Sequence, residues 1–491
     1  MKLEFLTEEL RCFTPVLRDS RLLEDSAEAV LPDRCPEVRE ILHVGGNALL
    51  RGQETGEGRI AVSAAVSAAA LVQPDGGDME VLEVYIPMSM TLEDPRLHAG
   101  HVSAVDLQLR RLEAHMSGPR KVQIRAAVSL TVAVWEKAGF NLPVSCNADQ
   151  VAVYQQKVPL QVLTGLWDKR YDLEDSVQIT EPGNLEAIAD CEAAVVHTDV
   201  RMTGSRAIFR GEIRLRVLYL DRDGALQLSH TELPYSQYID LEEGAEEDQL
   251  VLRTAITGLD TDKAEDGSLN LSIGLCTSAR VYARREASCI TDLYALQGEV
   301  APKWAEQTVE SLLDAKETEL QGKTTLSAGE KVLGVWCQPG ELDFQRDSEQ
   351  VHLSLPVSLR VLSGDGQQLR TDSGRVTLTG IIHAAPDTIL RGSGLRLSAA
   401  PSPGLDGVDI RVTGVLTLET MGISHLMTVE EAEWTDTPPN PDRPGLVIRR
   451  SAPGETLWSL AKQYRTSMDT IAQANDLGGD PTPGTLLLIP G

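Results

Sequence analysis

The chain has 491 residues, of which 42% are hydrophobic and only 4% are aromatic, and its formal net charge is −28. This length predicts about three or four domains, and the apolar content is enough to give each of them a buried core. The large negative charge repels nucleic-acid phosphates and anionic lipid headgroups, so we expect neither nucleic-acid binding nor membrane insertion.

The N-terminal segment MKLEFLTEELRCF lacks the apolar stretch of a secretory signal. The longest apolar stretch, residues 61–72, is shorter than the roughly 20 residues that a membrane-spanning helix needs. The seven cysteines are spread singly without a CxxC pair, which predicts reduced thiols instead of a disulfide framework or a zinc site. We therefore expect a cytoplasmic protein that holds no metal and no other cofactor.

Alternating apolar segments recur along the chain at nearly equal spacing. Each runs into an Asp-Gly pair, at Asp75-Gly76, Asp223-Gly224 and Asp365-Gly366. Asp-Gly between alternating strands favours a hairpin with a type I′ turn, in which both central residues have positive φ. Alternation with period two is typical of antiparallel sheets that bury one face.

This repetition predicts a mainly β fold, with three tandem β-sandwich-like repeats followed by one small C-terminal domain. The expected boundaries are an N-terminal lead-in over 1–19 and repeats over 20–148, 150–300 and 303–433. The segment TDTPPNPDRPG at 435–445 contains four prolines. Proline-rich segments are extended and semi-rigid, so this segment is the expected linker to the last domain.

Residues 446–491 resemble a LysM domain of βααβ order. The segment LVIRRSAPGETLWSLAKQY supplies a strand, a loop and a helix, TSMDTIAQAND a second helix, and PTPGTLLLIP the return strand. Apolar residues at helical spacing over 457–464 form one face of the first helix. Thr456 and Ser467 are suitable N-cap residues for the two helices. This domain has four basic and four acidic residues, so the net acidity lies upstream of it.

In LysM domains, N-acetyl sugars bind between the first loop and the loop after the second helix. By this resemblance, the candidate ligand-binding residues are Gly454, Glu455, Thr456, Leu457, Asn475, Asp476, Leu477, Pro483 and Gly484. Each also has a purely structural alternative, because glycines form turns, Leu457 packs in a core and Asn475 ends a helix. Glu455 stands where the family usually has an aspartate.

We do not expect an enzyme, and we assign no catalytic residue. The repeats and the LysM domain occupy nearly all of the chain, so no segment remains for a hydrolase domain. The chain has no GxSxG, HExxH or GxGxxG motif. The segment QGKTT at 321–325 lacks the first glycine of a P-loop, since Glu317 occupies that position.

Three acidic β repeats followed by a LysM domain resemble the SipL-type family of clostridial sporulation proteins, whose repeated unit is the SPOCS domain. The segment LLEDSAEAVLPDRCPEVREIL at 22–42 is similar to that family's acidic lead-in. The resemblance implies a non-enzymatic spore coat scaffold, made in the mother-cell cytoplasm and gathered at the forespore surface. Its implied partners are the coat-basement ATPase and other coat proteins, with the LysM domain as a protein-docking module.

The alternative is a cell wall or cortex protein that binds peptidoglycan through N-acetylglucosamine. The absence of an export signal weighs against this alternative, although lysis of the mother cell could bring the protein to the spore. The two hypotheses differ in what the LysM loops bind, a protein or a glycan.

Overall fold

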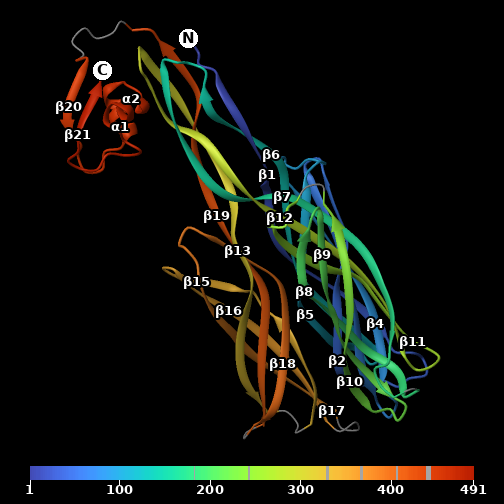
Figure 1. The fold of residues 1–491 in the computed structure, drawn as a ribbon. Helices are drawn as coiled ribbons and strands as arrows, with labels where there is room; N and C mark the ends of the chain where they lie inside the picture. Colours follow the sequence, from blue (N-terminus) through green and yellow to red (C-terminus); the bar gives the residue numbers. More distant parts are fainter. Residues whose placement is uncertain (182, 242–243, 328–330, 365–368, 405–406, 438–443) are drawn as a thin grey trace.

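The computed structural model describes residues 1–181, 183–241, 244–327, 331–364, 369–404, 407–437 and 444–491. Figure 1 shows a body built almost entirely of strands, with two short helices near the C-terminus. The predicted mainly β fold class is confirmed. Among the described helices, none has the length and apolarity needed to cross a membrane.

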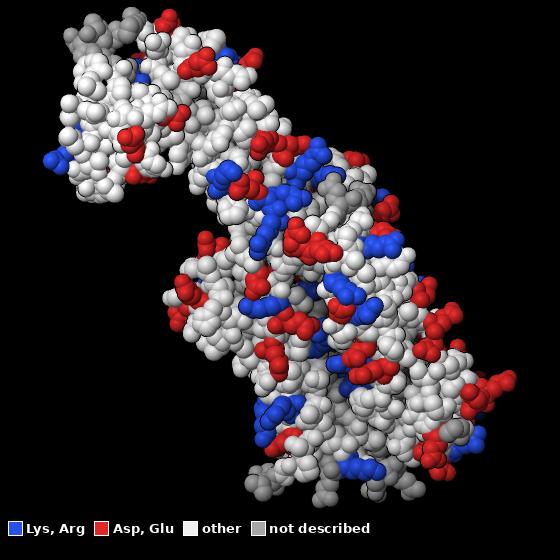
Figure 2. Space-filling view, in the orientation of Figure 1, with Lys and Arg blue, Asp and Glu red and all other residues white. Residues whose placement is uncertain are grey.

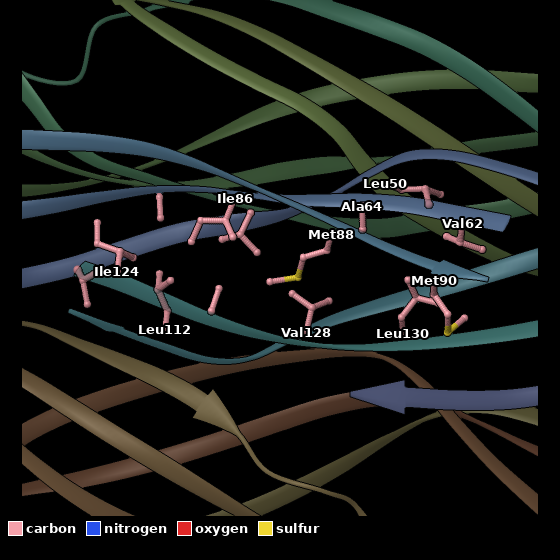
Figure 3. Packing of buried hydrophobic residues seen from close by; sticks show 14 of the residues in the cluster. Leu50, Val62, Ala64, Ile86, Met88, Met90, Leu112, Ile124, Val128 and Leu130 are labelled. Carbon is pink, nitrogen blue, oxygen red and sulfur yellow. The ribbon is translucent and has the colours of Figure 1, made fainter. Parts of the chain in front are cut away.

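The first six strands form two three-stranded antiparallel sheets, ordered β2-β3-β4 and β1-β6-β5. Their bounds are β1 (Phe5–Val30), β2 (Val38–Gly56), β3 (Arg59–Pro74), β4 (Glu80–Glu93), β5 (Val102–Gly118) and β6 (Lys121–Cys146). Both sheets alternate along each strand, so that their facing sides are apolar. Figure 3 shows Met88 and Met90 of β4 facing Val128 and Leu130 of β6 across the core between the sheets.

The next six strands repeat this arrangement, with sheets β8-β9-β10 and β7-β12-β11. Their bounds are β7 (Val151–Val177), β8 (Leu185–Thr203), β9 (Arg206–Asp221), β10 (Leu226–Asp240), β11 (Gln249–Lys263) and β12 (Leu269–Ala295). This unit has its own apolar core, in which Phe209 is a fully buried aromatic side chain.

The third unit follows the same plan, with β14 and β15 together in the place of β2 or β8. Its strands are β13 (Glu299–Leu326), β14 (Val332–Pro339), β15 (Asp343–Asp347), β16 (Gln350–Gly364), β17 (Leu369–His383), β18 (Ile389–Gly404) and β19 (Gly407–Thr435). A single pairing of Gln321 with Thr379 joins its two sheets. The same strand order thus recurs in all three units.

The Asp-Gly turns differ in detail from the expected type I′ geometry. Gly76 and Gly224 have positive φ, at 72° and 74°, but Asp75 and Asp223 do not. The loops between the strands are longer than two residues, and such loops need positive φ at the glycine alone. The third pair, Asp365-Gly366, lies outside the described residues.

The first and last strands of each unit pair over nearly their whole length and form long two-stranded ribbons. These ribbons are β1·β6, β7·β12 and β13·β19, and they extend beyond the sandwiches towards the chain termini (Figure 1). Residues 5–19, expected as a separate lead-in, are the first half of β1 and pair with residues 132–146 of β6. This pairing satisfies backbone groups that a lead-in would leave to water.

The three units lie side by side and share several buried clusters. The ribbons are joined by a cluster to which all six of their strands contribute, which comprises Leu10, Cys12, Leu142, Leu160, Val162, Ala287, Cys289, Val309 and Leu426. A second cluster joins the sandwiches, where Trp336 of the third unit meets Leu42 of the first and Leu218 of the second. The body is therefore one packed assembly of three units.

The C-terminal domain has the predicted βααβ order. Its elements are β20 (Leu446–Arg450), α1 (Leu457–Tyr464), α2 (Met468–Asn475) and β21 (Leu486–Pro490). Of the expected linker over 435–445, residues 438–443 lie outside the described residues. The helices cover one face of the two-stranded sheet, and Leu460, Ala461 and Ile471 are fully buried against it.

Candidate functional site

The two helices of the LysM domain begin at the predicted capping residues. The Thr456 hydroxyl accepts the Ser459 backbone N–H at 3.1 Å, and the Ser459 hydroxyl accepts the Thr456 N–H at 2.9 Å. This reciprocal pair is a capping box, which satisfies donors left open at the start of α1. Ser467 likewise accepts the Thr470 N–H at 3.0 Å at the start of α2.

Direct hydrogen bonds connect the two predicted ligand-binding loops. The backbone N–H of Leu457 donates to Asp480 Oδ1 at 2.7 Å, and the N–H of Gly484 donates to the Ser451 carbonyl at 2.8 Å. The Ser451 hydroxyl donates to the Thr482 carbonyl at 2.6 Å. The structure therefore places the two sets of predicted residues at the same end of the domain.

In the first loop, the fold itself uses the side chains of Glu455 and Leu457, in addition to the Thr456 cap described above. The Glu455 carboxylate accepts bonds from Arg449 at 2.7 and 2.9 Å and from the Ala452 N–H at 2.7 Å. Leu457 is buried in the domain core. Gly454 has φ of 85° and an exposed backbone, a conformation that disfavours other residues.

In the second loop, Asn475 connects α2 to β21. Its side chain donates to the Leu488 carbonyl and accepts the Leu488 N–H, both at 2.7 Å. Leu477 packs against the core, whereas the side chains of Asp476 and Pro483 are exposed.

Two of the predicted residues in the second loop have a left-handed backbone conformation. Asp476 ends α2 with φ of 49°, and Gly484 forms a turn with φ of 87°. Among the nine predicted residues, Asp476 and Pro483 combine an exposed side chain with no described side-chain bond, and Gly454 offers exposed backbone. The Gly484 N–H and carbonyl are already bonded to Ser451 and Arg450. A binding role for all nine stays a prediction.

Sequence reasoning did not identify Asp480, which bridges the two loops. Its carboxylate lies at the N-terminus of α1, where a negative charge is favourable, and accepts the Leu457 N–H. The available signal was its position directly before the Pro-Thr-Pro turn, where aspartate often bonds to nearby backbone.

The LysM domain is docked on the second ribbon, a contact that sequence reasoning also missed. The Trp458 indole N–H donates to Asp292 at 2.8 Å, and the Lys462 ammonium lies 2.7 Å from the same carboxylate. The Tyr294 hydroxyl donates to the Thr466 carbonyl at 2.6 Å. Helix α1 is therefore held by the end of β12.

Aromatic packing reinforces this contact. The Trp458 ring centroid lies 4.8 Å from that of Tyr294 and 5.1 Å from that of Tyr154. Partial burial raises the pKa of Asp292, but hydrogen bonds from Lys462 and Trp458 outweigh it, so the pKa is lowered below its ordinary 3.8. The carboxylate is therefore ionised at neutral pH and pairs with Lys462.

A second candidate site is a cavity of about 840 Å³ between the three units. Its arginines are already paired, since Arg216, Arg253 and Arg396 each bond to a glutamate. Within the described part of the chain, no group of three or more His, Cys, Asp or Glu side chains is arranged to hold a metal ion. The Arg253–Glu419 pair joins the second unit to the third, and the other two pairs lie within single units. Because these charges are already neutralised by one another, the cavity is the weaker candidate.

Comparison with known families agrees with the domain order of the chain. Residues 184–263, which span β8 to β11 of the second unit, match the family model described as SipL, SPOCS domain. Residues 452–490 match the LysM domain model, and both families are non-catalytic. No curated protein and no solved structure matches the chain. The chain thus combines a SipL-type SPOCS domain with a C-terminal LysM domain, as its sequence predicted, and these domains fit a sporulation coat-associated protein with peptidoglycan-binding potential.

Proposed function

We propose that the protein is a non-enzymatic scaffold of the spore envelope, which docks onto the coat-basement ATPase at the forespore surface. The observation that supports it most is the presence of a SPOCS domain and a LysM domain in one chain. In this proposal the protein resides in the mother-cell cytoplasm, where no wall glycan is available to the LysM loops, and it contacts other coat proteins through its β repeats.

The architecture suits a scaffold because each part has a fixed position. The three units share buried cores, and Trp458 and Lys462 fasten the LysM domain to Asp292 at the end of a ribbon. A binding module held in one orientation loses little conformational entropy when it meets its partner. The exposed backbone at Gly454 can pair with an extended peptide segment of that partner.

The decisive test uses the purified full-length chain and the loop variant Asp476→Asn with Pro483→Ala. Asparagine tolerates the positive φ of position 476, so the variant should fold. We expect the wild-type chain to retain the ATPase from a sporulating lysate, and the loop variant to retain at least tenfold less. Pro234→Ala, which changes an exposed proline of β10, is the matched control and should behave as wild type.

The alternative function is binding of peptidoglycan through N-acetylglucosamine, which the LysM match favours. It predicts that the chain sediments with purified sacculi, that chitin-derived oligosaccharides release it, and that the loop variant no longer sediments. Sedimentation with sacculi combined with no retention of the ATPase would replace the scaffold proposal by this alternative.

A further inference from the structure

The two-stranded sheet of the LysM domain is apolar on both faces. Its inward residues, among them Leu487 and Ile489, are buried under the helices. Three cross-strand pairs point outward, namely Leu446 with Pro490, Ile448 with Leu488, and Arg450 with Leu486. We call these six residues the outer face.

The outer face is exposed to an unusual degree for its composition. Leu446, Ile448, Leu486 and Leu488 are 53%, 59%, 58% and 38% exposed. An antiparallel sheet with one wet face normally alternates apolar and polar residues, whereas strands covered on both faces are apolar throughout. A contiguous aliphatic group of this kind marks an interaction surface.

The fold leaves the outer face open to a large partner. The helices lie on the opposite face of the sheet, and α1 carries the contact of Trp458 with Asp292 on the ribbon. In Figure 1 the helices lie between this sheet and the ribbons, at one extremity of the molecule. A partner on the outer face therefore need not touch the three-unit body.

The distribution of charge over the chain indicates which partner can bind the outer face. The whole chain carries −28, but residues 446–491 have four basic and four acidic residues. Figure 2 shows many charged side chains along the body and fewer at the LysM end on the same side of the molecule. Two copies that meet through their LysM domains keep their acidic bodies apart, beyond a screening length of about 10 Å. The one charge of the outer face, on Arg450, is directed to the Gly484 carbonyl at 2.9 Å.

We propose that the outer face is a self-association surface, on which the LysM domains of two copies of this chain pack face to face. Such a contact is isologous, because the same aliphatic patch supplies both sides and a two-fold axis relates them. Six residues per copy cannot bury the roughly 1,000 Å² of a stable interface, so the dimer is weak and depends on concentration. This inference goes beyond the proposed scaffold function and does not require it.

The test is sedimentation equilibrium of the purified full-length chain over a wide concentration range. The variant Ile448→Thr with Leu488→Thr removes aliphatic surface and places threonine, a β-branched strand former, at both positions. Ile381→Thr changes an equally exposed isoleucine, 58% exposed on β17, and is the matched control. We expect the average mass of wild type and control to rise from 53.3 kDa towards twice that value, and the outer-face variant to associate at least tenfold more weakly.

Two results would overturn the inference. One is a wild-type chain that stays at 53.3 kDa at every concentration, and the other is an outer-face variant that dimerises as well as wild type. If the wild-type chain is monomeric and the outer-face variant also loses the ATPase, the face belongs to that partner and self-association is wrong. Circular dichroism and thermal unfolding of the variant verify that it is folded. Because only the purified chain is weighed, failure here leaves the scaffold function standing.

Discussion

Glu419 of β19 is a buried carboxylate that joins the third unit to the second. It accepts bonds from Arg280 at 2.6 and 2.9 Å and from Arg253 at 3.1 Å. Burial raises its pKa, but the two arginines outweigh burial and lower the pKa below the ordinary value. A buried ion pair tolerates the loss of one partner poorly, because the remaining charge stays desolvated.

We therefore expect Glu419→Gln to lower the free energy of unfolding by about 3 kcal/mol. The control is Glu431→Gln, which breaks an exposed, solvent-screened pair with Lys2 and should cost far less than Glu419→Gln. Urea unfolding followed by circular dichroism measures both variants. Equal losses in the two variants would show that the buried pair does not hold the units together.

His197 makes the folding stability of the three-unit body depend on pH. Burial lowers its pKa from 6.5 to about 4, helped by the positive charges of Arg396 and Arg253, and its ring nitrogens bond to Tyr235 and Thr254. Between these two pKa values, His197 is protonated in the unfolded chain and neutral in the folded chain. Stability from this group is complete above pH 6.5 and decreases as the pH falls from 6.5 towards 4.

For wild type this loss amounts to about 1 kcal/mol between pH 7.5 and 5.5. The variant His197→Gln should lose about 1 kcal/mol less than wild type over the same interval. The substitution also removes the hydrogen bonds of His197, but this loss is the same at both pH values. It therefore cancels when the change in unfolding free energy between the two pH values is compared in wild type and variant. The same difference in both proteins would mean that His197 titrates normally in the folded chain.

At the residue level, the sequence predicted positions whose role depends on near neighbours. Thr456 and Ser467 were predicted as caps because capping involves residues three positions apart. Asp292 and Trp458 were not predicted as partners, because they are far apart in sequence and nothing local indicates their contact. Asp480 lies between these cases, since its turn was recognisable but its bond to Leu457 was not.

At the level of elements, the contact between α1 and the second ribbon decides where the LysM loops lie. We expect Trp458→Ala to weaken this contact by about 2 kcal/mol, because it removes a hydrogen bond to Asp292 and two aromatic contacts. Small-angle X-ray scattering should then show a larger radius of gyration. Gln473→Ala, an exposed change on α2, is the control. A scattering curve identical to that of wild type would show that the domain remains docked without Trp458.

Period-two alternation predicted the strands well, but not how far they extend. Residues 5–19 of β1 have too few buried positions to stand out as a strand, and their pairing depends on residues 132–146. A ribbon is specified by long-range register, which a single strand's pattern does not contain. The expected boundary at residue 20 therefore missed half of the first ribbon.

At the level of the whole molecule, the sequence pattern predicts repeats but contains no signal for how they pack against one another. Leu42, Leu218 and Trp336 meet at one junction although more than a hundred residues separate each from the next. Nothing local to any of them indicates this contact, so the sequence does not indicate that the three units lie side by side. That arrangement gives the scaffold proposal a rigid body with the LysM domain at one extremity (Figure 1).

The most direct measurement for the scaffold proposal is the position of a fluorescent fusion of the full chain in sporulating cells of its own host. We predict a shell around the forespore, on its mother-cell side, which disperses when the coat-basement ATPase is absent. Signal along the vegetative cell wall, or signal unrelated to sporulation, would contradict the proposal.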